Sequence, residues 1–230
     1  MSSERANVST VESHYDAEYY QGHFGALLDD ELNYRLLSLY WRYVLFERHR
    51  LDVSARVLDY GSGIGQVSAA LGDAICFDIS PVAISELKKR GRAVIERKED
   101  IPPATFDYLL SSHSLEHSTS PFVDLKEFRT YMRPTGQIVL VLPIERNFKP
   151  ALKPDWDRHL QCWTFQSVTN LLVATGWTPV AQSIVYGPYF LRTAGRRFSD
   201  RWAVRTARLF GRIRRGFPSM LTIARVSAGT

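Results

Sequence analysis

A glycine-rich turn and two acids are the residues of this sequence best placed to do chemistry. A strand expected at 56–59 ends in Asp59, the turn Tyr60-Gly61-Ser62-Gly63-Ile64-Gly65 follows, and 66–71 is expected to begin a helix. Glycines let the backbone pass close to a ligand, and a helix N-terminus offers free N–H groups. Asp78 ends the next expected strand, where a carboxylate can accept hydrogen bonds from both hydroxyls of a ribose. The pattern predicts a nucleoside-binding crevice.

The same turn favours a nucleoside that carries a cation over one that carries phosphates. A dinucleotide fingerprint needs glycine at its first, third and sixth positions, and the sixth position counted from Gly61 is Gln66. Asp59 is awkward beside a pyrophosphate but suits an ammonium group. A nucleotide-dependent oxidoreductase is therefore the weaker alternative.

Strands and helices alternate along the rest of the chain. Further strands are expected at 74–78, 94–95, 106–111, 136–142, 179–186 and 221–226, and helices at 80–90, 121–131 and 164–175. Before them, 14–49 has a helical pattern, with Asp29 or Asp30 as a possible cap. The alternation predicts an α/β sandwich around a mostly parallel sheet.

Six motifs in order resemble those of class I S-adenosylmethionine-dependent methyltransferases. They are VLDYGSGIG at 57–65, FDIS at 77–80, EDIP at 99–102 with Phe106-Asp107, SHSLEH at 112–117, MRPTGQ at 132–137, and His159-Leu160 with Trp163-Thr164. The match covers about residues 54–186, and it departs from the family at Thr135 and in a long insertion before the last strand. The resemblance implies a Rossmann-like, seven-stranded α/β fold with S-adenosylmethionine as cofactor.

The resemblance also implies roles for the matched residues. Gly61 and Gly63 would pass under the methionine part of the cofactor, Asp59 would anchor its ammonium group, and Asp78 would hold the ribose. Asp100, with Glu99 as a rival, would meet the adenine amine. Ser111 or Ser112 would face the sulfonium, and an N-terminal helix carrying Tyr15, Tyr19 or Tyr20 would act as a lid. The full expected cofactor set is Asp59, Gly61, Ser62, Gly63, Asp78, Ile79, Asp100, Ile101, Ser111 and Tyr20.

Two histidines are the candidate general bases. His113 follows the fourth strand, near the expected methyl position, and His159 lies in the last motif. Neither is required, because a sulfonium methyl is already electrophilic and alignment alone can promote transfer. His113 to His117 reads HxxEH, an inverted zinc-helix pattern, but no further ligand is obvious nearby in the sequence. We therefore expect no metal site, and Glu116 and His117 as structural residues.

Positive charge is concentrated in one segment. The chain carries a net charge of +5, yet 192–217 holds nine arginines and one acid, a net of +8. On a helix Arg201, Arg205, Arg208, Arg212 and Arg215 form one stripe, and Trp202, Leu209, Ile213 and Phe217 a separate face. This is either an insertion with a solvated arginine face or a contact for anions. Arginine without lysine favours phosphate, so an anionic membrane surface or a phosphate-bearing acceptor ranks above RNA.

Composition places the chain among soluble globular proteins. It has 230 residues, 45% hydrophobic and 23% charged, and only two cysteines, so a disulfide scaffold is excluded. Cys76 is expected to be buried, and no secretory signal is evident in residues 1–10, so a cytoplasmic protein, possibly peripheral at the membrane, is the default. The expected organisation is a loose tail at 1–12, a helical lid at 13–50 and a catalytic domain at 51–230, with a basic helical insertion at 187–217.

The function expected from these features is methyl transfer to a small-molecule, glycan-linked or lipid-linked acceptor. The alternative of a different class is a cofactor-binding module without catalysis that acts at a membrane surface or with a partner. An intact crevice with a blocked acceptor side would favour that alternative.

Overall fold

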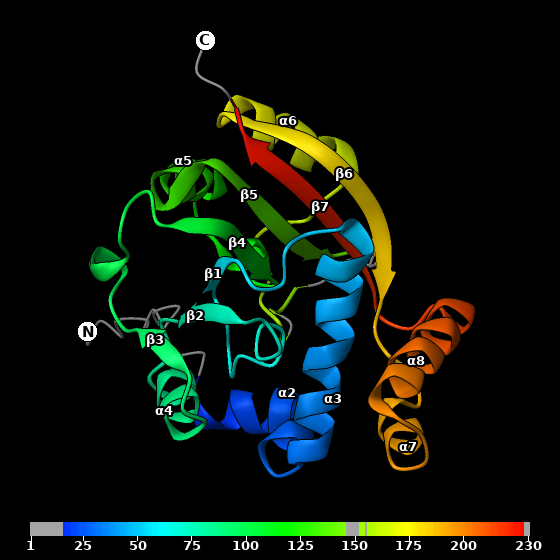
Figure 1. The fold of residues 1–230 in the computed structure, drawn as a ribbon. Coiled ribbons are helices and arrows are strands. Elements are labelled where there is room, and N and C mark those ends of the chain that lie inside the picture. Colours follow the sequence, from blue (N-terminus) through cyan, green and yellow to red (C-terminus); the bar gives the residue numbers. More distant parts are fainter. Residues whose placement is uncertain (1–15, 146–151, 155, 228–230) are drawn as a thin grey trace.

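The computed structural model describes residues 16–145, 152–154 and 156–227 (Figure 1). The expected tail at 1–12 lies outside these residues. The strands are β1 Arg56–Tyr60, β2 Asp73–Phe77, β3 Ala93–Ile95, β4 Phe106–Ser112, β5 Met132–Pro143, β6 Trp177–Tyr186 and β7 Pro218–Val226. The α-helices are α2 Ala17–Leu28, α3 Glu31–Trp41, α4 Pro81–Lys89, α5 Pro121–Tyr131, α6 Phe165–Ala174, α7 Leu191–Gly195 and α8 Asp200–Arg214.

All seven strands form one sheet in the order β3-β2-β1-β4-β5-β7-β6. Neighbours from β3 to β5 pair in parallel, whereas β7 runs antiparallel to both β5 and β6. This confirms the Rossmann-like fold. The strand order reverses next to β1, so the carboxyl ends of β1, β2 and β4 meet at the place where such sheets bind ligands.

Alternate residues of the central strands pack into two separate cores. Val57 of β1 faces a core that includes α3, α7 and α8, whereas Leu58 faces a core that includes α5 and α6. The middle of β5, Ile138 to Leu142, is buried on both faces. This burial explains the unbroken apolar run of that strand.

The stretch after the glycine turn corrects one expectation. Residues 66–71 form successive turns and no α-helix, so the crevice is built by a strand and a loop without a helix N-terminus. Gly65 has a left-handed φ of 76°, and Gly72 follows after six residues. A segment this short between two glycines has too few residues to nucleate a stable helix.

The N-terminal helices begin at aspartate caps. Asp16 accepts hydrogen bonds from the backbone N–H groups of Glu18 and Tyr19 at the start of α2, and Asp30 caps α3. A π-helical segment, η1 Arg42–Phe46, and a 3-10 turn, η2 Glu47–His49, continue α3 toward β1. In the described residues two further 3-10 turns, η3 Lys98–Asp100 and η4 Leu115–His117, lie near the crevice motifs.

The basic insertion consists of α7 and α8, which extend beyond the ends of β6 and β7 and pack beside α3 (Figure 1). Helix α8 passes so close to the loop after β6 that a Cβ at Gly211 would lie 2.3 Å from the Gly187 carbonyl oxygen. A glycine that weakens a helix is therefore required here for packing. The helix ends at Arg214, so Arg215 and Phe217 lie beyond it, both at left-handed φ.

Candidate cofactor crevice and histidine cluster

The glycine turn lies against the neighbouring strand and the loop after β4. The N–H groups of Gly61 and Ser62 donate to the Phe77 carbonyl at 2.9 and 3.1 Å. Gly61 has φ 71°, and a Cβ there would lie 2.4 Å from Cβ of Ser114. Gly63 has φ 54°, and the nearest atom to a Cβ built there belongs to the Phe24 ring, at 3.6 Å. Glycine is therefore needed at 61 for close packing and at 63 for backbone conformation.

Asp78 is fixed at the carboxyl end of β2. Its carboxylate accepts from the N–H of Gly63 at 2.8 Å and from that of Ser80 at 2.9 Å, and it also bonds to the Tyr20 hydroxyl. Burial nevertheless raises the pKa of this carboxyl above its ordinary value. The hydroxyl that meets Asp78 from α2 is the kind of donor that a ribose would offer.

Asp59 is the second buried acid of the crevice. It is 1% exposed, and burial raises its pKa to about 6, although Ser68 and Arg92 act in the opposite direction. Its Oδ2 and the Ser62 hydroxyl have no hydrogen-bond partner among the residues that the structure describes. Buried polar atoms of this kind are costly unless a ligand completes them, and a cationic group would complete Asp59.

Comparison with known proteins decides the family. A methyltransferase-domain family model matches residues 30–182, more than half of the chain. The chain belongs to this methyltransferase family. No curated protein sequence matches it significantly.

Solved methyltransferase structures share the fold. A 1,6-didemethyltoxoflavin-N1-methyltransferase from Burkholderia thailandensis, with bound S-adenosylhomocysteine, is 19% identical, with 92% of this chain and 85% of that chain covered and a TM-score of 0.58. A chain of the Haloferax volcanii complex between the activator Trm112 and a protein assigned as a methyltransferase is 14% identical. The match covers 91% of this chain and 98% of that chain, with a TM-score of 0.62. An S-adenosylmethionine-dependent methyltransferase from Archaeoglobus fulgidus is 16% identical, with 88% of this chain and 99% of that chain covered and a TM-score of 0.56. At these identities the likeness shows the fold alone.

The protein is a methyltransferase, and the crevice residues fit S-adenosylmethionine as its cofactor. Asp59 offers an unsatisfied buried oxygen, and Asp78 directly follows β2. Ile79, 45% exposed, follows Asp78 as an open apolar surface. Ile101 is buried.

Two other residues predicted to bind the cofactor, Asp100 and Ser111, are held by neighbouring residues of the chain. Asp100 lies on η3, and its carboxylate is held by both guanidinium N–H groups of Arg97, at 2.8 and 2.7 Å. Ser111 is fully buried, and its hydroxyl donates to Ser114, which in turn donates to the Tyr60 carbonyl. Ser111 thus braces the loop at Gly61. Contact of either residue with the cofactor stays a prediction.

Helix α2 supplies two tyrosines to the crevice. Tyr20 is 4% exposed and its ring stacks on Phe24, with 5.5 Å between centroids. Burial, with smaller effects from Asp157, Glu116 and Asp78, raises the pKa of Tyr19 to about 12. Tyr19 therefore shares its electrostatic surroundings with Asp78 and Glu116. Their contact with bound cofactor stays a prediction.

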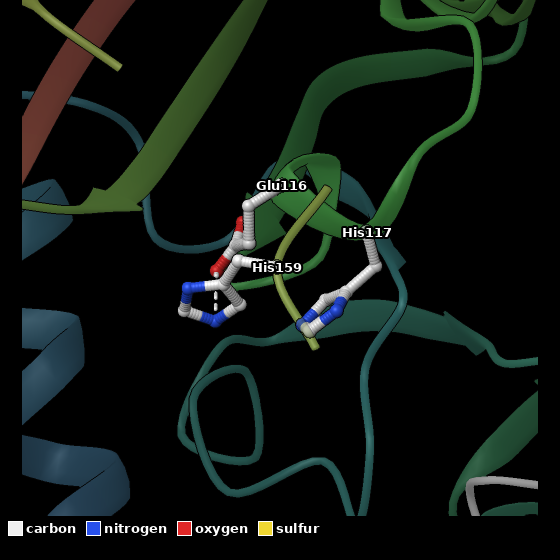
Figure 2. A group of neighbouring side chains, drawn as sticks. All are labelled: Glu116, His117 and His159. Atoms are coloured by element: carbon white, nitrogen blue, oxygen red, sulfur yellow. Dashed lines mark ion pairs between the residues drawn. The ribbon is translucent and has the colours of Figure 1, made fainter. Parts of the chain in front are cut away.

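The two candidate bases meet at Glu116, the middle residue of η4. His113, at a left-handed φ of 53°, has its Nδ1 3.4 Å from Oε1 of Glu116 and its Nε2 3.1 Å from the Ser219 hydroxyl. His159 has its Nε2 4.0 Å from the same Oε1. The sequence shows no further ligand near the HxxEH motif, but the fold places His159 beside it. Figure 2 shows Glu116 and His117 on one segment facing His159 on another.

Glu145 is a residue that sequence reasoning missed. It follows β5 and its Oε1 is 2.5 Å from Nδ1 of His159. Its position just beyond the carboxyl end of a central strand is the same signal that identified Asp59 and Asp78, and that signal could have found it.

Proposed function

We propose that this methyltransferase meets its acceptor, a lipid-linked molecule, at an anionic membrane surface through α8. The observation that supports the proposal is the outward face of that helix. Trp202, Leu209 and Ile213 are 65%, 56% and 65% exposed. Large apolar side chains rarely gather on a solvent-facing helix surface without a partner.

Helix α8 presents three different faces. Small residues pack inward, namely Ala203, Val204, Ala207 and Gly211. The apolar ridge of Trp202, Leu209 and Ile213 lies on the outward side, and the arginine stripe runs next to it. Interfacial helices have this arrangement, in which the ridge enters the boundary of the bilayer and the arginines contact headgroups.

The arginines of this helix carry uncompensated charge. Within the described residues no ion pair engages Arg201, Arg205 or Arg212, and the acid at the helix start, Asp200, is already bound by Arg35 of α3. The pKa of Arg48 is lowered first by burial and then by Arg208, with a smaller effect from Arg212. Arg48 therefore extends the positive surface onto the N-terminal helices.

No helix in the described part of the chain is long and apolar enough to cross a membrane. Attachment in the plane of the interface is the form of association that this helix supports. RNA is the weaker alternative, because single-stranded RNA is read by aromatic platforms among the basic residues. The exposed ridge of α8 is aliphatic apart from Trp202, which favours lipid.

Methyl transfer depends more on the alignment of the acceptor atom with the methyl group than on activation of that group. S-adenosylmethionine supplies an electrophilic methyl group on its sulfonium. The chain then has to hold the acceptor atom in line with that group and to exclude water. His113 and His159, joined through Glu116 at the end of β4, are the residues proposed to accept a proton from the acceptor.

Vesicle binding tests the proposed surface. The triple variant Arg205→Glu, Arg208→Glu, Arg212→Glu should lose binding to vesicles of phosphatidylcholine with phosphatidylserine by at least about a hundredfold, at about 1 kcal/mol per basic residue near the surface. Trp202→Ser with Ile213→Ser should weaken binding while preserving its dependence on salt.

A matched control reverses the same charge elsewhere. Lys88→Glu, Lys89→Glu and Arg97→Glu change the net charge equally at exposed positions away from α8. That variant should bind vesicles several times more tightly than the α8 variant. Equal losses in both variants would show a general charge effect, and equal binding by the α8 variant and the wild type would overturn the proposal.

A further inference from the structure

Glu116 is a buried carboxylate that lacks a hydrogen-bond donor. It is 0% exposed, and neither carboxylate oxygen has a hydrogen-bond partner among the described residues. Isolating an ionised carboxylate in this way costs several kcal/mol unless it is paired or coordinates a metal. The fold holds such a group at the carboxyl end of β4, beside three histidines.

Backbone hydrogen bonds fix the cluster from two sides. The carbonyl of Glu116 accepts from the N–H of Leu160 at 2.9 Å and from that of Gln161 at 3.0 Å. These bonds hold the segment that carries His159 against η4. The cluster is therefore part of the fold, although His159 is more than forty positions from Glu116 and His117 in the sequence.

The three side chains offer donor atoms at short mutual distances. One ligand atom each from Glu116, His117 and His159 lies within 4.8 Å of the other two (Figure 2). Ligands about 2.1 Å from one metal ion are roughly 3.4 Å apart in a tetrahedral site. The rings of His117 and His159 lie edge to face, with 4.9 Å between their centroids.

Glu145 orients the second histidine. A carboxylate can only accept, so Nδ1–H of His159 donates to Oε1 of Glu145 across 2.5 Å. The lone pair of Nε2 is then left on the side of Glu116. A carboxylate that holds the far nitrogen of a histidine is the usual second layer of a metal site.

We propose that Glu116, His117 and His159 bind a divalent transition-metal ion, with Glu145 as the positioning residue of His159. Two imidazoles and one carboxylate match Zn²⁺ best, whereas Mg²⁺ and Ca²⁺ prefer oxygen ligands alone. Three protein ligands leave a fourth position open. His159 then has its Nδ1–H on Glu145 and its Nε2 on the metal, so at a metal-loaded site it has no nitrogen left to accept a proton. His113, with Nδ1 3.4 Å from Glu116, is the remaining candidate base.

The direct test is calorimetric titration of Zn²⁺ into tag-free, chelator-treated protein without cofactor. The wild type should bind one ion per chain at micromolar or lower concentration. Glu116→Gln and His159→Gln should weaken binding at least about a hundredfold, and Glu145→Gln about ten- to a hundredfold. Saturating Zn²⁺ should raise the unfolding midpoint of the wild type by roughly 5–10 °C and leave Glu116→Gln unchanged.

Two control variants separate this site from incidental binding. Cys162→Ser removes an exposed thiol near His159 in sequence, and His49→Gln removes a partly buried histidine of another element. Both should bind Zn²⁺ as the wild type does. Loss of binding in Cys162→Ser with retention in Glu116→Gln would overturn the proposal, as would a wild type that binds neither Zn²⁺, Mn²⁺ nor Co²⁺ below roughly 100 μM, an affinity of about −5.5 kcal/mol.

Folding of each variant is checked by its circular dichroism and by titration with S-adenosylhomocysteine. Glu116→Gln should bind the nucleoside as the wild type does, because Asp59 and Asp78 are untouched. A folded variant that binds nucleoside but not Zn²⁺ supports the metal site. A protein that binds nucleoside and no metal contradicts the metal site alone, and the vesicle experiment stands apart from both.

Discussion

The two halves of the strand-end site are assembled in different ways. The cofactor half uses residues of one short stretch, Asp59 to Asp78, whose glycines and acids are placed by two adjacent parallel strands. The other half, which we propose takes the acceptor, collects Glu116, His159 and Glu145 from three separate segments. Local spacing can encode the first half, whereas only the finished fold creates the second.

Gly61 and Ser114 are where the two halves touch, and Gly61→Ala is expected to have the largest effect. The new Cβ would lie 2.4 Å from Cβ of Ser114 at a left-handed φ. The cost should be roughly 2–5 kcal/mol in the free energy of unfolding, combining overpacking with backbone strain. Denaturant unfolding of the purified variant measures it.

Gly91 supplies the matched control for that variant. It has φ 66°, and nothing lies within 4 Å of the position of its Cβ, so Gly91→Ala should cost only the backbone term, about 1 kcal/mol. The double variant Gly61→Ala with Ser114→Gly should lose at least about 1 kcal/mol less of the free energy of unfolding than the sum of the two single losses. If the losses of the two single variants simply add, the two halves are not coupled through the contact between Gly61 and Ser114.

Asp59 allows a second test, because burial raises its pKa to about 6 from an ordinary value of 3.8. Between these two values the folded protein holds the proton more tightly than the unfolded chain does. Asp59 therefore favours the folded state at low pH, and that contribution is lost as the pH rises through 6. The loss is about 3 kcal/mol by pH 7.

Asp59→Asn should remove this pH dependence. The measurement is the free energy of unfolding from pH 4 to 7 without cofactor, for the variant and the wild type. The wild type should lose up to about 3 kcal/mol more than the variant across this range, since all other groups are common to both. Parallel curves would mean that the carboxylate of Asp59 is solvated or paired in solution. If the curves differ as expected, Asp59 is both the acid that limits the stability of the cofactor-free protein and the acid that a cationic ligand would pair with.

Most of the cofactor half could be predicted from sequence, because its signals are local. Hydrophobic runs located the strands, and Asp59 and Asp78 follow directly from strand ends. The expected helix at 66–71 was wrong because the six residues between Gly65 and Gly72 are too few to nucleate a stable helix. For the insertion, the arginine stripe was visible in the sequence, but the outward direction of the apolar ridge was not, since packing against α3 decides it.

The histidine cluster could be predicted only in part. The HxxEH spacing was visible, and His159 was identified for other reasons. Their meeting depends on the two backbone bonds from Leu160 and Gln161 to Glu116, which no pattern of residue types encodes. A search for acids directly after central strands would have added Glu145.

Within the cofactor half, Asp78 and Asp100 provide the smallest and sharpest contrast. Asp78 is buried and tied to the glycine turn by two backbone N–H groups, whereas Asp100 lies exposed and already neutralised by Arg97, which lowers its pKa. Asp78→Ala should weaken S-adenosylhomocysteine binding at least roughly tenfold, about 1.4 kcal/mol. Asp100→Asn should weaken it less than about threefold, because an exposed, paired carboxylate has little left to offer.

Calorimetric titration of both variants ranks the two acids on one scale. A loss at Asp100→Asn as large as that at Asp78→Ala would show that Arg97 releases the carboxylate when the nucleoside binds. Arg97→Gln then distinguishes the two cases. It should leave affinity unchanged if Asp100 stays outside the site, and raise affinity if Arg97 competes with the ligand for that carboxylate. In either case Asp78 would still contribute to nucleoside binding, because the hydrogen bonds that fix its carboxylate do not involve η3.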